Sequence, residues 1–182
     1  MPRVAGVLRL FVAAYPPPEV RRAMSALLKP LDLAPHAAVP ADQVHLTLQF
    51  IGDTPARDLE RVLESARRAA AGTRSLSLSP RRLITLPDRG VPRLVAVQTD
   101  APPVLVELHH RLAQRLASKV RQRPGGFCPH LTLCRFRHDA RSARVDQPIA
   151  MEPFPLGDIC VVKSTLRPTG AVHEIIESIP LE

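Results

Sequence analysis

The sequence predicts an α+β fold with largely antiparallel sheets, for three reasons. The chain has 182 residues, which fits one domain or two small lobes with a shared interface. Its hydrophobic patterns follow the mixed order strand, helix, strand, helix, strands, helix, strands. The tetrapeptide His-Leu-Thr-Leu occurs at residues 45–48 and again at 130–133, each time at the end of a helix-and-strand block. We therefore expect a two-lobed, pseudo-two-fold fold over residues 1–182, with antiparallel sheets lining a central cleft and helices outside.

The first half of the chain begins with an apolar, β-prone segment from Leu8 to Tyr15, which three prolines end. A helix pattern starts at Glu19, with apolar residues three or four positions apart. Residues 44–51 alternate between apolar and polar side chains, as in a strand. Thr54-Pro55 has the form of a helix cap followed by a first-turn proline, and Gly72 is a suitable end for that helix.

The second half contains one long helix between groups of strands. Pro102 and Pro103 open this helix, and Pro124-Gly125-Gly126 stops it. Its apolar stripe consists of Leu105, Leu108, Leu112, Leu116 and Val120. The predicted strands are Leu76–Leu86, Leu94–Thr99, His130–Phe136, Leu156–Thr165 and Val172–Ile179.

The chain is strongly basic, with a net charge of +8 at pH 7. Such a charge attracts a polyanion such as RNA. All but three of the 25 basic residues are arginines, however, so a bias in genome base composition explains the excess equally well. The charge supports RNA binding without establishing it.

Three cysteines, Cys128, Cys134 and Cys160, have no spacing typical of a disulfide framework. We therefore expect reduced thiols and a cytoplasmic protein. Residues 1–6 contain no apolar run typical of a signal peptide, and no stretch of 18 apolar residues predicts a membrane span.

The repeated tetrapeptide carries the chemistry. On a strand, His45 and Thr47 lie on one face, as do His130 and Thr132, while the leucines point into the core. Each copy thus presents an imidazole beside a hydroxyl on a rigid support. A single histidine in a strand is usually only a polar residue with its hydrogen bonds satisfied, but two copies of the same pattern disfavour that interpretation.

These motifs resemble the two-histidine (2H) phosphoesterase superfamily, and within it the RNA 2′,3′-cyclic phosphodiesterases, also called LigT-like 2′-5′ RNA ligases. The resemblance covers nearly the whole chain. The matching segments are Arg9-Leu10-Phe11, residues 44–52, residues 129–135 and Ser164-Thr165-Leu166. The chain departs from the family pattern at Ala38, where many relatives carry Trp, at His173, where an aromatic residue is usual, and at Cys134, where Ala is common.

The resemblance implies a hydrolase that converts RNA 2′,3′-cyclic phosphate ends to 2′-phosphates, with possible ligation through a 2′-5′ linkage. It assigns His45 as proton donor to the leaving oxygen and His130 as proton acceptor from water. An imidazole suits either role because its pKa is close to neutrality. No metal or other cofactor is expected, because the two histidines supply both proton transfers.

Three further residues are candidates for binding the substrate. The Thr47 and Thr132 hydroxyls are suited to donate hydrogen bonds to the non-bridging phosphate oxygens, and Arg135 is the nearest cation. Strict alternation places Arg135 on the face opposite His130, so a bulge in the strand is needed for this role. Without one, Arg135 is a solvated surface residue.

Several alternatives remain open from the sequence. Cys128, His130 and Cys134 do not have the spacing of a usual zinc site. The pairs Arg81-Arg82 and Arg89 with Arg93 are suited either to an RNA-binding rim or to solvated loops. The expected partner is RNA with a 2′,3′-cyclic phosphate end or a related nucleotide. The protein itself is expected to be a monomer that does not bind a membrane. The alternative functions are a phosphodiesterase for small cyclic phosphates such as ADP-ribose 1″,2″-cyclic phosphate, and a non-catalytic module that binds RNA ends.

Overall fold

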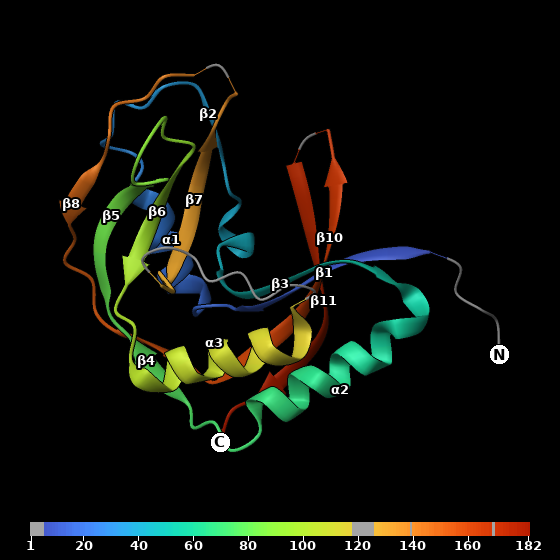
Figure 1. The fold of residues 1–182 in the computed structure, drawn as a ribbon. Helices are drawn as coiled ribbons and strands as arrows, with labels where there is room; N and C mark the ends of the chain where they lie inside the picture. Colours follow the sequence, from blue (N-terminus) through green and yellow to red (C-terminus); the bar gives the residue numbers. More distant parts are fainter. Residues whose placement is uncertain (1–5, 118–125, 139, 169) are drawn as a thin grey trace.

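The computed structural model describes residues 6–117, 126–138, 140–168 and 170–182, and it confirms the α+β class (Figure 1). The helices in this part of the chain are α1 (Pro18–Ala26), α2 (Leu59–Ala70) and α3 (Pro103–Leu116), with short 3-10 turns at Ala41–Gln43 and Ala56–Asp58. The strands are β1 (Val7–Ala14), β2 (His36–Ala38), β3 (Leu46–Pro55), β4 (Leu76–Leu78), β5 (Pro80–Leu86), β6 (Leu94–Thr99), β7 (His130–Phe136), β8 (Asp146–Pro148), β9 (Phe154–Leu156), β10 (Asp158–Arg167) and β11 (Gly170–Pro180).

The large sheet consists of two halves that meet at one residue pair. Its order is β11-β10-β1-β3-β7-β6-β5-β8, with β2 also beside β7, and all pairs are antiparallel. Between β3 and β7 the pairing is limited to Leu46 and Leu131. We call β1, β3, β10 and β11 lobe 1, and β2, β5, β6, β7 and β8 lobe 2. The two predicted sheets are thus halves of one ladder, which diverge on either side of this junction (Figure 1).

The helices cover the outside of the sheet. Helix α2 packs against α3 and touches β10 and β11, while α3 touches β3. Figure 1 shows α2 on the outer side of lobe 1, α3 running below both lobes, and α1 behind lobe 2. The four predicted leucines Leu105, Leu108, Leu112 and Leu116 are all buried. They belong to the same core cluster as Leu46 and Leu131, so one core anchors the junction between the lobes.

The start of α2 differs from the prediction. Thr54 and Pro55 do not open a helix, because they extend β3 and pair with Leu8 and Val7 of β1. The Thr54 hydroxyl donates to the Gly52 carbonyl at 3.2 Å instead of capping a helix. Helix α2 begins later, at Leu59, and Gly72 ends it with a positive φ of 70°. Tertiary pairing with β1 here overrides a local signal.

The predicted strand at residues 76–86 is divided between two sheets. Its first part, β4, pairs with β9 in a small two-stranded sheet, and its second part, β5, joins the large one. Strands β2 and β8 were not predicted, and both are three-residue, exposed segments without an apolar alternation. Helix α3 ends at Leu116, because Ala117 already has an extended backbone, so it is shorter than the predicted helix that Pro124-Gly125-Gly126 was to stop. Val120, Pro124 and Gly125 themselves lie outside the described residues.

Candidate active site

The two copies of the motif lie side by side at the junction of the lobes. Leu46 is the second residue of one copy and pairs with Leu131, the second residue of the other. In an antiparallel pair this register places His45 across from Thr132 and Thr47 across from His130. In a regular ladder, diagonal neighbours such as the two histidines are about 7–8 Å apart. The four polar side chains therefore surround the Leu46–Leu131 pair with local two-fold symmetry, while the leucines are buried below them.

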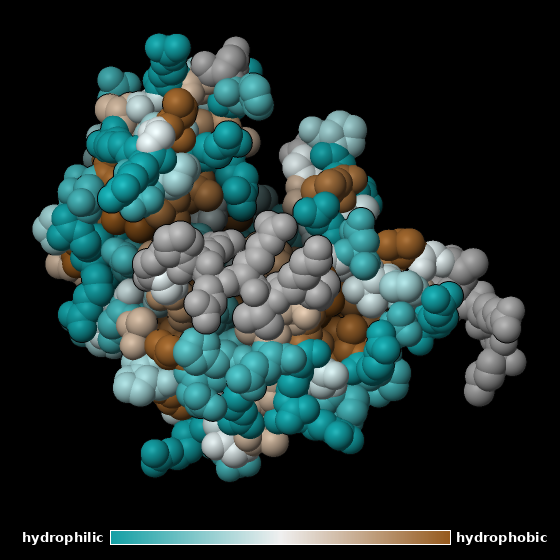
Figure 2. All heavy atoms as spheres, in the orientation of Figure 1, coloured by the Kyte–Doolittle hydropathy of each residue, from teal (hydrophilic) through white to brown (hydrophobic). Residues whose placement is uncertain are grey.

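The molecular surface is notched between the two lobes. Figure 2 shows a notch between the strands of lobe 2 and the β10–β11 hairpin of lobe 1. The two lobes meet where β3 passes β7 (Figure 1). His45, Thr47, His130 and Thr132 are half-buried, so each is held by the fold and still open to solvent.

Both histidines are oriented by the same backbone contact. The Nδ1–H of His45 donates to the Gln43 carbonyl at 2.7 Å, and the Nδ1–H of His130 donates to the Cys128 carbonyl at 2.8 Å. A carbonyl oxygen only accepts hydrogen bonds, so each contact assigns the proton to Nδ1 in the neutral imidazole. Nε2 is then the ring nitrogen without a proton in the neutral form of both imidazoles. The sequence held no signal for Gln43 or Cys128, because backbone atoms make both contacts.

His45 is packed among other rings. Its centroid lies 5.1 Å from Phe11, 5.6 Å from Tyr15 and 5.0 Å from His173. Its Nε2 lies 3.1 Å from the Thr47 hydroxyl. The Gln43 side chain also accepts a hydrogen bond from the His173 backbone N–H at 3.2 Å, which ties β11 to the loop before the motif. Tyr15 was missed by the sequence analysis, although it follows the strand that pairs with β3.

The environment of His45 favours its neutral form in the free protein. Burial lowers the pKa of His45 to about 4, the Gln43 carbonyl opposes this shift, and repulsion from Arg135 and from the charged forms of His173 and His130 adds to it. Burial and the charge of Arg135 also lower the pKa of His173, against the attraction of Asp42. A site that gathers cationic groups in this way is suited to an anion, whose charge reverses the shift.

We therefore expect inorganic phosphate to raise the pKa of His45 by at least about one unit, which corresponds to about 1.4 kcal/mol of differential binding. The reason is that an anion beside Nε2 stabilises the charged imidazole. The measurement is an NMR titration of the histidine ring protons with and without phosphate. His45→Gln identifies the signal by removing it. A His45 pKa that stays unchanged while phosphate binds would contradict this picture of the site.

Arg135 lies on the active-site face because of a bulge. In the register with β6, Thr132 pairs with Ala96 and Cys134 with Val95, so Leu133 is the extra residue. Leu133 and Cys134 are consecutive and both buried, which breaks the alternation. Beyond the bulge the faces exchange, and Arg135 returns to the side of Thr132. Its charge lowers the pKa values of both His45 and His173, and no described residue pairs with it.

The first copy of the motif contains the same irregularity. In the register of β3 with β1, Thr47 pairs with Ala13 and Gln49 with Val12, which leaves Leu48 as the extra residue. Leu48 and Leu133 are both the fourth residue of their copy. His109 of α3 is half-buried and hydrogen-bonded through Nδ1 to the Leu48 carbonyl at 2.7 Å. The helix therefore supports the bulge in β3.

Other candidates from the sequence lie elsewhere or have other partners. Within the described ranges, no three His, Cys, Asp or Glu side chains gather as a metal site would require. Cys128, Cys134 and Cys160 are free, and burial raises the pKa of the Cys134 thiol. Arg82 pairs with Asp146 at 2.7 Å and Arg81 with Asp100 at 3.8 Å. Among the helices that the structure describes, none is long and apolar enough to cross a membrane.

Comparisons with known proteins agree with this geometry. The family model of the 2′-5′ RNA ligase superfamily matches residues 11–164. The RNA 2′,3′-cyclic phosphodiesterase of Thermus thermophilus is 30% identical over 186 residues, covering 96% of this chain and 90% of that protein. The enzyme of the same name from Archaeoglobus fulgidus is 26% identical over 172 residues, covering 92% and 97%.

Solved structures show the same fold. TT0787 of Thermus thermophilus matches with a TM-score of 0.75 and 28% identity, covering 96% of this chain and 98% of that one. E. coli LigT complexed with 3′-AMP matches with a TM-score of 0.78 and 23% identity, covering 97% and 99%. The fold, the paired motifs and the family match lead to one conclusion: this chain belongs to the 2′-5′ RNA ligase superfamily of two-histidine phosphoesterases.

Proposed function

We propose that this protein hydrolyses the 2′,3′-cyclic phosphate at an RNA end to a 2′-phosphate, with His45 as proton donor and His130 as proton acceptor. The observation that supports this proposal best is the pairing of Leu46 with Leu131, from which both histidines are expected on one face of the sheet. Both imidazoles also make the same Nδ1 contact with a backbone carbonyl. Several relatives are RNA 2′,3′-cyclic phosphodiesterases. Residues 1–182 act as one two-lobed unit, and a monomer suffices because one chain supplies both histidines.

The reaction needs two proton transfers on opposite sides of phosphorus. Water attacks phosphorus in line with the ribose 3′-oxygen, and Nε2 of neutral His130 takes the proton of the attacking water. The new P–O bond forms as the P–O3′ bond breaks, and Nε2 of charged His45 gives its proton to the departing 3′-oxygen. The phosphate remains on O2′. The two imidazoles then return to their starting states by exchange with solvent. A 5′-hydroxyl in place of water forms a 2′-5′ linkage by the same steps.

Negative charge grows on the non-bridging oxygens during attack. Thr47 and Thr132 flank the junction pair, and their hydroxyls are in position to donate to those oxygens. Arg135 reaches the same face through the bulge at Leu133 and offers a planar, charged donor set. Bound phosphate also gives His45 the charge that it needs as an acid, because the anion offsets the burial that lowers its pKa in the free protein.

The test is incubation with an oligonucleotide that ends in a 2′,3′-cyclic phosphate. We expect a 2′-phosphate product, at a rate that EDTA leaves unchanged because the histidines carry both proton transfers. A 3′-phosphate product would contradict the choice of leaving oxygen, and loss of activity in EDTA with recovery on adding a divalent ion would overturn the mechanism. Faster turnover of ADP-ribose 1″,2″-cyclic phosphate would identify a small-molecule enzyme. Binding without turnover would indicate an RNA-end-binding module.

A further inference from the structure

The inner face of lobe 1 continues beyond the histidines. Phe11 is 5.1 Å from the His45 ring on one side and 6.1 Å from the Phe50 ring on the other. Phe11 and Phe50 are paired in the β1–β3 register, so both side chains point to the same face. Phe11 is buried, whereas Phe50 is 62% exposed. Two ring contacts thus lead from the catalytic imidazole to an aromatic face that is open to solvent.

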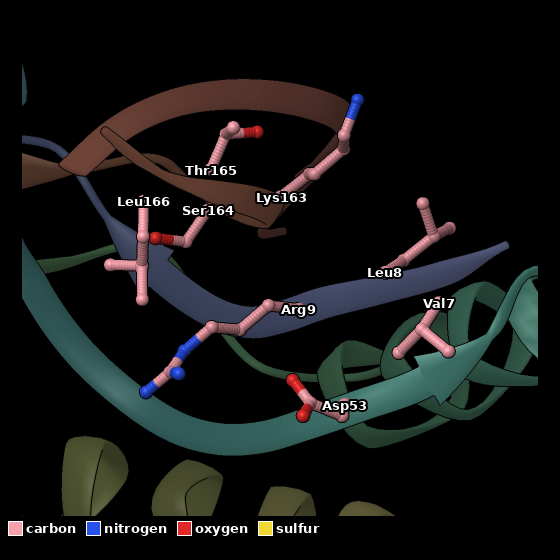
Figure 3. A pocket seen from close by; sticks show the side chains of 8 residues that line it. All are labelled: Val7, Leu8, Arg9, Asp53, Lys163, Ser164, Thr165 and Leu166. Atoms are coloured by element: carbon pink, nitrogen blue, oxygen red, sulfur yellow. The ribbon is translucent and has the colours of Figure 1, made fainter. Parts of the chain in front are cut away.

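A hollow of about 360 Å³ lies farther along the same strands, and its lining includes Arg9 of β1, Asp53 of β3 and residues 163–166 of β10. It forms where β10 leaves β1, since the pairing of these strands ends at Leu10 and Lys163. Figure 3 shows Ser164 and Leu166 of β10 pointing toward β1, with Lys163 and Thr165 on the other side of the strand. Arg9 precedes Phe11 by two residues, so it lies on the same face about 6–7 Å along the strand. The hollow is therefore an extension of the face that carries His45.

Arg9 has a charge available for a ligand. No described residue forms an ion pair or hydrogen bond with it. Asp53 is its neighbour across the β1–β3 ladder, but Figure 3 shows the guanidinium extending away from that carboxylate, toward the end of the hollow where Leu166 lies. Lys163, in contrast, pairs with Glu174 at 2.9 Å.

A second hollow, of about 460 Å³, lies beside Tyr15, but it is less suited to a phosphate. Its cation, Arg21, donates to the Asp42 carbonyl and lies 5.8 Å from the centre of the Tyr15 ring. Asp158 and the buried Cys160 complete its polar lining. Arg9, which pairs with none of the described residues, and the exposed ring of Phe50 are both on the other side of His45, and a cation and an aromatic ring are the two elements that single-stranded nucleic acid binds.

We propose that Phe50 and Arg9 form a subsite for the nucleotide that precedes the cyclic-phosphate nucleotide in the RNA strand. Its base stacks on Phe50, and the phosphate that joins it to the next nucleotide upstream binds Arg9. The subsite rests on the proposed function, because the position of the cyclic phosphate at the histidines sets the direction of the strand. It makes the enzyme prefer an RNA strand over a single nucleotide.

The test compares a nucleoside 2′,3′-cyclic phosphate with a trinucleotide that ends in the same group. Phe50→Ser and Arg9→Gln are each expected to raise KM for the trinucleotide at least about 5-fold, the lower end of what one stacked base contributes. Their kinetics on the single nucleotide should equal those of the wild type. Arg9→Gln should also reduce the slope of log(kcat/KM) against log salt by about 0.7 for the trinucleotide.

Two matched variants serve as controls. Val91→Ser replaces another exposed apolar residue, 60% exposed, and Arg61→Gln removes a charge on α2, on the outer side of lobe 1. Neither control variant should change the kinetics on the single nucleotide or on the trinucleotide. Unchanged trinucleotide kinetics in Phe50→Ser and Arg9→Gln would overturn the subsite, as would an equal loss on both substrates. If the wild type hydrolyses neither substrate, the proposed function fails, and the subsite fails with it.

Discussion

Replacing His45 or His130 by alanine is expected to lower kcat by about 10²- to 10⁴-fold, the usual contribution of general acid or base catalysis. Each variant removes one of the two proton transfers and leaves the other group in place. The double variant should lose little more than the worse single variant, because the acid and the base act as a unit on one transition state. The measurement is kcat on an oligonucleotide with a 2′,3′-cyclic phosphate end.

His110→Ala is the matched control, since His110 is exposed on α3. It should keep wild-type activity. Thermal melting of the four variants and the wild type separates loss of chemistry from loss of folding. A single variant with more than a tenth of wild-type kcat would contradict the assignment of that histidine to proton transfer. Losses that multiply in the double variant would show that the two histidines act in independent steps.

The elements that were predicted well are those whose own sequence pattern determines them. The leucine stripe of α3 and the alternation of β7 each depend on side chains within the element, so periodicity was sufficient. The same alternation predicted that His45 and Thr47, or His130 and Thr132, share a face. The sequence repeat also indicated two similar half-sites, and the Leu46–Leu131 pair is their meeting point.

What the sequence did not predict depends on contacts between distant segments. The start of α2 moved because Thr54 and Pro55 pair with β1, and β2 exists only through its pairing with β7. The short strand β8 likewise depends on β5. No periodicity within a segment reports such pairing, because the partner strand supplies the hydrogen bonds.

The two bulges show the same limit at the active site. Sequence analysis identified Arg135 as a candidate that alternation places on the wrong face. Its position depends on one extra residue, Leu133, against β6. The matching bulge at Leu48 is held by His109, a residue of α3 far away in sequence. The repeat therefore predicts where chemistry occurs, whereas the surrounding strands and helix decide which neighbouring side chains reach it.

The low pKa of His45 bears directly on its proposed role as proton donor. An acid with a pKa of about 4 is neutral at neutral pH, so it has no proton to donate in the free protein. Burial is the main cause of this low pKa and the charge of Arg135 adds to it. In the proposed mechanism, the same charge of Arg135 attracts the substrate's phosphate. Binding of the anion and charging of His45 are therefore coupled, since each favours the other. In the proposed mechanism, His45 therefore gains the proton that it donates when the substrate binds.

The assignment of donor and acceptor can be tested with a substrate in which sulfur replaces the leaving 3′-oxygen. A thiolate leaves with a conjugate-acid pKa close to 8.5, far below that of an alcohol, so it needs little protonation. The analogue should restore most of the about 10²- to 10⁴-fold loss in His45→Ala, because the missing proton is no longer required. It should restore none of the loss in His130→Ala, since water must still be deprotonated. The reference is the ratio of kcat on the sulfur analogue to kcat on the oxygen substrate in the wild type. Rescue of His130→Ala alone would reverse the two roles, and rescue of neither variant would mean that protonation of the leaving oxygen is not what His45 contributes.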